Sequence, residues 1–152
     1  MKPSSSLVTL LKILIGLVLA VTAVGKLLDN RGFATVLQTY QTFPEGSLLG
    51  LGLCISLAEL GLAVWLFSGR YLRLAALTAL LMHLTYAIWS AVSVLRDLKI
   101  SNCGCFGVFW ARPLGWSTVV EDLVLTALCL VLYLAAGLKA PSSGRLTSSH
   151  RE

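Results

Sequence analysis

The sequence LVTLLKILIGLVLAVTAVGKLL, residues 7–28, decides the fold class of this chain. At a rise of about 1.5 Å per residue, a helix over this run is long enough to cross the hydrocarbon core of a bilayer. Lys12 and Lys26 lie near its two ends, where their alkyl stems let the ammonium groups reach the headgroups. We therefore predict a membrane span. A cleaved signal peptide is the alternative, because Lys2 precedes the run, but further apolar runs follow it.

The composition of the whole chain agrees with a membrane protein. Of 152 residues, 57% are hydrophobic and 12% are charged, and this charged share is about half of that in soluble proteins. Three more apolar runs, at 48–67, 74–95 and 116–138, predict three further spans. Because a spanning helix satisfies its own backbone hydrogen bonds, the predicted fold is an all-α, antiparallel four-helix transmembrane bundle.

Two segments outside the spans also carry predictions. In 29–46, apolar residues recur at helical spacing and predict a short interfacial helix ending before Pro44: Phe33, Val36, Leu37, Tyr40 and Phe43. The C-terminal residues 140–152 contain Pro141 and several serines, and predict a disordered cytoplasmic tail after a single membrane domain over 1–139.

The distribution of basic residues predicts the orientation. Of the 12 Lys and Arg residues, seven lie in the tails, at Lys12 and in the turn at 68–73, and five lie on the other side. This bias favours both termini in the cytoplasm and the loop at 96–115 outside, on the periplasmic side. The net charge of +5 is spread over short loops and tails, so no nucleic-acid partner is expected.

That outer loop contains the sequence SNCGCFG, residues 101–107, with two of the four cysteines. Cys103 and Cys105 can reach each other only if the backbone bends, and Gly104 permits that bend. A strained bridge is easily reduced, so we interpret the pair as redox-active. Two free cysteines in a loop, or half of a metal site, are the alternatives. Lys99 and Arg112 would lower a thiol pKa if the loop folds back, unless they bind lipid headgroups instead.

Glu59 is a carboxylate near the middle of the second span, so it should be neutral, paired or facing a polar cavity. Lys26 is one candidate partner, but His83 lies at a more similar depth and is the better geometric match. Two interpretations stay open. Glu59 is either a proton site coupled to thiol oxidation or part of a buried pair that fixes helix register.

Polar residues also follow single faces of the last two spans. His83, Tyr86 and Ser90 share a face of the third span, and a second set shares a face of the fourth: Asp122, Thr126, Cys129 and Tyr133. Together they suggest a cavity for a quinone headgroup, a cofactor that the sequence does not establish. The alternative is a hydrogen-bonded core histidine.

Cys54 and Cys129 raise the question of a second thiol. Cys54 is shallow enough for the loop to reach it. The favoured alternative is a small residue in a helix-packing face with Gly46, Gly50 and Ala58. Cys129 is expected in the core.

Three motifs together resemble a known family. They are Gly25-Lys26-Leu27 closing the first span, Glu59 with Gly61 in the second, and Cys103-Gly104-Cys105-Phe106-Gly107 after the third. Over roughly residues 8–138 the chain is similar to the methylamine utilisation protein MauE family, within the DoxX-like group of small four-span membrane proteins. The family pattern has an arginine near the start of the fourth span, where this chain has Glu121 and Asp122.

The resemblance implies periplasmic disulfide chemistry at the bacterial inner membrane. Such proteins are associated with maturing the disulfide-rich small subunit of methylamine dehydrogenase, alongside a thioredoxin-like partner. We therefore expect a thiol-disulfide oxidoreductase with Cys103 and Cys105 as the exchanging pair, and with the bilayer, a thioredoxin-like protein and a disulfide-containing client as partners. The rivals are a metal-binding or transport protein, using the same pair with His83, Met82 or Cys54, and a non-catalytic assembly factor.

Overall fold

The computed structural model describes residues 5–138, and all regular structure in that range is helical. The helices are α1 (Ser5–Leu28), α2 (Asn30–Gln38), α3 (Leu48–Ser68), α4 (Leu72–Leu95) and α5 (Trp116–Gly137), with a 3-10 turn at Glu45–Ser47 before α3. Four of them, α1, α3, α4 and α5, are long and apolar enough to cross a membrane. The predicted all-α bundle of four spans is confirmed. The predicted tail at 140–152 lies outside the described residues.

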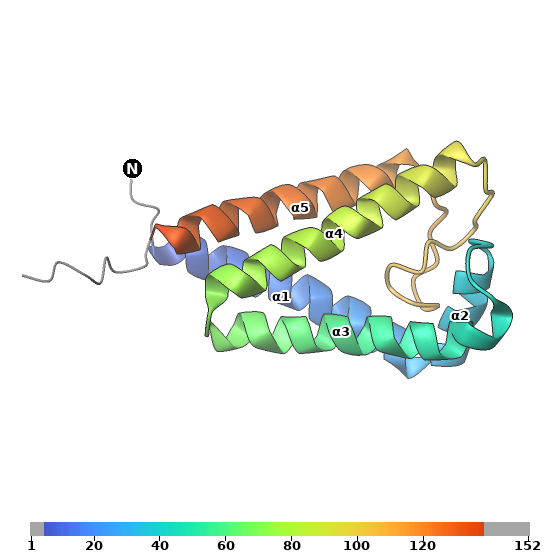
Figure 1. The fold of residues 1–152 in the computed structure, drawn as a ribbon, viewed down its shortest axis with the longest axis horizontal. Coiled ribbons are helices and arrows are strands. Elements are labelled where there is room, and N and C mark those ends of the chain that lie inside the picture. The colour runs from blue at the N-terminus through green and yellow to red at the C-terminus, as the bar shows by residue number, and fades with distance from the viewer. Residues whose placement is uncertain (1–4, 139–152) are drawn as a thin grey trace, which may run out of the picture.

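The four long helices form two antiparallel pairs, α1 with α3 and α4 with α5 (Figure 1). The start of α1, the end of α5 and the short α3–α4 turn lie at one end of the bundle (Figure 1). The segment 96–115 and α2 lie at the opposite end, where they fill the space between the diverging pairs (Figure 1). The first end is called the turn end below, and the second the loop end.

The turn end is tightly packed because α4 presents small side chains there. Ala75, Ala76 and Ala79 are fully buried, which lets the neighbouring helices approach closely. Larger side chains from the other helices complete this core, including Ile15, Leu66 and Leu132. Many large apolar residues face outward along all four long helices, as expected for a surface covered by lipid.

The loop end has a second, smaller apolar cluster around α2. Phe33, Val36 and Tyr40 pack there against Ile100 of the loop. The Asp29 side chain accepts a hydrogen bond of 2.8 Å from the Gly32 backbone N–H and so caps the start of α2. The short helix predicted in 29–46 is therefore present, and it ends at Gln38.

The predicted small-residue packing face of α3 is wrong. A Cβ added at Gly46 or Gly50 would meet no atom within 4 Å, and Cys54 and Ala58 are exposed. This face points away from the other helices in residues 5–138. Because α3 is apolar on nearly all sides, its sequence pattern does not indicate which side turns inward.

Candidate functional site

The cysteine loop folds back on itself and enters the bundle between the two helix pairs (Figure 1). Two backbone hydrogen bonds close it, from Cys103 N–H to Arg112 O at 2.8 Å and from Leu114 N–H to Ile100 O at 2.9 Å. Asn102 fixes the turn inside: its side-chain oxygen accepts from Gly104 N–H at 2.9 Å, and its amide donates to Gly107 O at 3.2 Å. Sequence analysis assigned no role to Asn102, although an asparagine before a turn often bonds the backbone two residues on.

Two glycines in the loop are required by its backbone. Gly104 and Gly107 have φ values of 73° and 70°, in the left-handed region that side chains disfavour. A Cβ at Gly107 would also collide with the Gly25 carbonyl of α1, and a Cβ at Gly25 would collide with the Phe106 carbonyl. The loop and α1 therefore meet backbone to backbone. This contact joins two of the three motifs on which the family resemblance was based.

The turn brings the two thiols together. The Sγ atoms of Cys103 and Cys105 lie 2.6 Å apart without a disulfide between them, and the Cys105 N–H lies 3.5 Å from the Cys103 sulfur. Cys103 is buried, and Cys105 is half-buried. The Tyr40 hydroxyl donates a hydrogen bond of 2.8 Å to the Cys103 carbonyl and anchors the loop to the end of α2. Tyr40 was predicted only as an apolar helix residue, and nothing in its spacing signals this role.

The surroundings of the two thiols differ in their effect on ionisation. A hydrogen bond from the Cys105 thiol lowers the pKa of Cys103 to about 6, and the Cys105 N–H and the Arg112 guanidinium lower it further against the opposing effect of burial. The same hydrogen bond, together with burial, raises the pKa of Cys105. Cys103 is therefore the thiolate of the pair near neutral pH.

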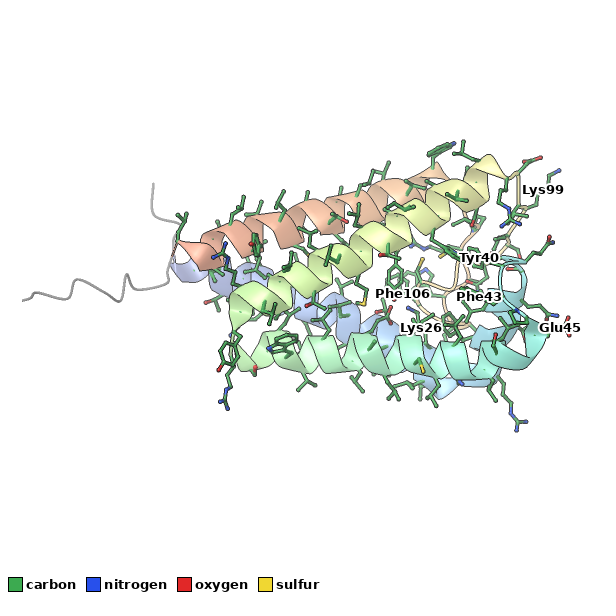
Figure 2. All side chains as sticks on the ribbon, viewed as in Figure 1. Lys26, Tyr40, Phe43, Glu45, Lys99 and Phe106 are labelled. Atoms are coloured by element: carbon green, nitrogen blue, oxygen red, sulfur yellow. The ribbon has the colours of Figure 1, made fainter. Side chains whose placement is uncertain are left out.

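Arg112 is held in place by Glu121 at the start of α5. Its guanidinium donates to the two carboxylate oxygens of Glu121 at 2.9 and 2.7 Å, a bidentate pair. The expected role of Arg112 beside the thiols is consistent with this geometry. Lys99 is exposed at the loop end and points away from the bundle (Figure 2), so the second expected base does not approach the sulfur atoms.

Glu59 pairs with Lys26, which corrects the preference for His83. The Lys26 Nζ lies 2.5 Å from Glu59 Oε1, and the Tyr86 hydroxyl donates to the same oxygen at 2.8 Å. Lys26 and Glu59 are 4% and 1% exposed, so the ion pair is sealed from solvent. Depth counting missed this pair because it used Cα positions, whereas the lysine side chain spans the difference. Lys26 and Phe106 both lie in the interior of the bundle (Figure 2).

His83 instead faces Asp122 of α5. The His83 Nδ1 lies 4.0 Å from the nearer Asp122 oxygen, so the expected meeting of these faces of α4 and α5 is confirmed. His83 is 3% exposed, and among the described residues neither ring nitrogen has a hydrogen-bond partner.

These groups line one cavity of about 340 Å³ at the loop end. Its wall includes the cysteine turn, the ionisable residues above and apolar side chains from α1, α3, α4 and α5. The structure thus brings together most of the expected site residues: Lys26, Glu59, His83, Cys103, Gly104, Cys105 and Phe106. Cys54 and Cys129 lie elsewhere. Cys54 is exposed on the outer face of α3, and Cys129 is buried in the core at the turn end.

Comparison with known proteins gives the family. The profile described as methylamine utilisation protein MauE matches residues 4–135. The chain belongs to the MauE family. It is 31% identical over 137 residues to methylamine utilization protein MauE of Paracoccus denitrificans, covering 90% of this chain and 73% of that protein.

A second MauE relative, from Paracoccus versutus, is 28% identical over 111 residues, covering 73% of this chain and 60% of that protein. No solved structure matches the chain. The resemblance predicted from the three motifs is confirmed.

Proposed function

We propose that this MauE-family protein is a membrane thiol-disulfide redox protein that takes two electrons from a pair of thiols, either in a periplasmic thioredoxin-like protein or directly in a client whose disulfides are thereby formed. The contact between the Cys103 and Cys105 sulfurs, 2.6 Å apart, is the observation that carries this proposal. The Arg112 guanidinium and the lowered pKa of Cys103 support it, because exchange requires a stable thiolate.

The difference between the two thiols sets the direction of attack. When a thiolate attacks a disulfide, one sulfur is attacked and the other departs as the leaving group. The sulfur whose thiol has the lower pKa departs faster, so attack on the other sulfur is favoured. A partner thiolate therefore attacks Cys105, the Cys103–Cys105 bond breaks and Cys103 leaves as a thiolate beside Arg112. The partner's second thiolate then breaks the mixed disulfide, which leaves the partner oxidised and Cys105 reduced. Two electrons move to the protein, and no atom other than protons is transferred.

The family name supplies the context for this chemistry. The relatives are named for methylamine utilisation, and the proposed role is maturation of a disulfide-rich methylamine dehydrogenase subunit. We place the loop end at the periplasmic face of the bacterial inner membrane and both termini in the cytoplasm. Disulfides formed at that face persist, whereas the cytosol would reduce them.

The decisive experiment is trapping of the mixed disulfide. In Cys103→Ser, the remaining Cys105 thiol can attack the disulfide of an oxidised thioredoxin-like protein, and no Cys103 thiol is present to break the resulting mixed disulfide, so we expect an adduct with the exported, oxidised partner on non-reducing gels. Cys54→Ser is the matched control, because its thiol is exposed on α3 and away from the cavity, and it should show no accumulation. Absence of an adduct from both Cys103→Ser and Cys105→Ser removes the proposal.

The rival functions predict other outcomes. No group of three or more His, Cys, Asp or Glu side chains in residues 5–138 is arranged to hold a metal ion, so the metal hypothesis gains no structural support. A non-catalytic assembly factor would mature its client normally when both loop cysteines are serine. Client maturation in the double variant therefore separates assembly from exchange.

A further inference from the structure

The cavity below the cysteine turn has the size and wall of a small-molecule site. Its volume of about 340 Å³ lies within the range of about 300–1,000 Å³ that such sites occupy. The wall combines apolar side chains with polar ones, and its polar groups include Lys26, Glu59, His83, Tyr86 and Asp122. Such a site suits a flat, largely apolar ring with polar atoms at its edge.

Buried polar atoms of three side chains in this wall, Glu59, His83 and Arg112, lack hydrogen-bond partners among the described residues. Both ring nitrogens of His83 and the Oε2 atom of Glu59 are unpaired, and the two residues are 3% and 1% exposed. Leaving such groups unpaired costs free energy, so a ligand that bonds them is stabilised. A neutral histidine offers one N–H donor, which fits a carbonyl oxygen, and one acceptor, which fits a hydroxyl.

Part of the cavity wall is exposed on the outer surface of the helix bundle. Thr85 of α4 lines the cavity and is also exposed, and the same wall includes Leu51 and Ile55 of α3. Toward the loop end, the rings of Phe43 and Trp89 stack with centroids 5.4 Å apart and form part of the same wall. An opening at Thr85 would face the bilayer, where a lipid-soluble ligand is available.

We propose that the cavity binds the ring of a quinone-class molecule, with its apolar tail passing between α3 and α4, and that this ring takes the two electrons that Cys103 and Cys105 collect. This inference rests on the proposed function and names its electron acceptor. With Cys103 as the thiolate, the S–H bond of Cys105 breaks, one S–S bond forms, and two O–H bonds form on the ring, one with the Cys105 proton and one with a proton from solvent. The reduced pair and quinone thus become disulfide and hydroquinone, with two electrons transferred and two protons taken up by the ring.

In this arrangement His83 donates a hydrogen bond to one ring carbonyl. The thiols contribute to the same cavity wall as His83, so no long electron path is needed. His83 thus contacts the quinone ring. The Lys26–Glu59 ion pair holds the polar side chains of the cavity wall in place.

Binding is tested first, on oxidised protein in lipid nanodiscs. Titration with a ubiquinone analogue carrying a ten-carbon tail should quench the fluorescence of Trp89 in a saturable manner, and Trp89→Phe should abolish that component. His83→Leu should weaken binding roughly fivefold to tenfold, the effect of losing one hydrogen bond. His83→Gln keeps an N–H donor and should restore most of the affinity. Quenching that does not saturate, or that is equal in all variants, overturns the proposal.

Electron transfer is tested on the reduced protein without oxygen. One quinone should be consumed for every two thiols lost. Thr85→Trp, at the opening, should slow this reaction about tenfold or more by blocking entry, whereas Thr78→Trp, exposed further along the same helix, should not.

Exchange with the thioredoxin-like partner serves as the separate readout. Normal trapping with no quinone reduction refutes the quinone site alone. Loss of trapping with intact quinone reduction refutes the proposed partner chemistry alone. Equal rates in Thr85→Trp and Thr78→Trp refute the entry route and, with it, the site as placed.

Discussion

At the scale of single residues, the unequal thiols are the chief result. A two-residue spacing places both sulfurs in one turn, and the environment assigns different roles to them. Cys103 accepts from the Cys105 N–H and lies near Arg112, and its pKa is lowered by the hydrogen bond between the two thiols, which raises the pKa of Cys105. The sequence predicted the pair and one of its bases. It did not predict which sulfur would be the thiolate, because that depends on hydrogen-bond direction in a folded turn.

The first prediction concerns the pH dependence of alkylation. Because the pKa of Cys103 is lowered to about 6, its thiolate is present above that pH, and the rate should fall as the pH drops through it. Cys105→Ala removes the largest lowering cause, so the midpoint should move upward toward the ordinary thiol value of about 8.5. Arg112→Gln should move it in the same direction by less.

Rates of iodoacetamide labelling, measured by mass spectrometry in a Cys54→Ser, Cys129→Ser background, test this. A midpoint above 8 in the unsubstituted pair would contradict the assignment of Cys103 as the thiolate.

The second prediction concerns the buried ion pair. Lys26→Met leaves the Glu59 carboxylate buried with only the Tyr86 hydroxyl as partner, and should lower the free energy of unfolding by about 3–5 kcal/mol. Adding Glu59→Gln removes the uncompensated charge and should recover much of that loss. Unfolding curves in detergent micelles give both values. If the double variant is no more stable than the single one, the pair is not the reason for the loss.

At the scale of elements, hydropathy locates the spans but does not orient them. The four long runs, the short helix and the outer loop are all visible in the sequence because length and apolar content define them. The outward-facing small residues of α3 and the choice of Lys26 over His83 were not predictable in this way. Glu59 marks one inward-facing position of α3, but the rest of this helix is so evenly apolar that its hydrophobic pattern does not distinguish an inner from an outer face. The close contact of Gly25 with Gly107 likewise joins segments far apart in the sequence, which spacing alone cannot connect.

The third prediction tests that contact. Gly107→Ala places a Cβ at a φ of 70° and against the Gly25 carbonyl, and should cost about 1–3 kcal/mol. The displaced turn should also reduce the yield of the trapped mixed disulfide. Gly50→Ala is the control, since open space surrounds it on α3 and alanine favours helix, so stability should be unchanged or slightly higher. Equal stability of the two variants would show that the loop tolerates a shift away from α1.

At the scale of the whole molecule, the loop end and the turn end differ in chemistry as well as packing. The thiols, the ionisable groups and the cavity all lie toward one end, and the opposite end is alanine-rich core. The composition and the charge bias predicted four spans and an orientation. The cavity could not be predicted in this way, because it depends on how far the helices diverge from one another in three dimensions.

The fourth prediction concerns sidedness. In a chain whose four native cysteines are serine, Ser101→Cys at the loop end should react with a membrane-impermeant maleimide in intact spheroplasts. Ser68→Cys, at the turn end, should react only after lysis. Both native serines are exposed, so access alone does not separate them. The reverse pattern would place the loop in the reducing cytosol and contradict the proposed exchange with a periplasmic protein.

The buried alanines of α4 also have a consequence for how the helix pairs can move relative to each other. Because Ala75, Ala76 and Ala79 are at 0% exposure, we expect the helix pairs to separate less at the turn end than at the loop end. Backbone amides of α4 should therefore exchange with deuterium slowly near Ala76 and progressively faster toward Trp89. Replacing Ala76 with leucine would disturb the close packing at the turn end and reduce the difference in amide exchange rate along α4. Such a gradient would mean that the bundle opens mainly at the loop end, where the sulfur atoms of Cys103 and Cys105 lie.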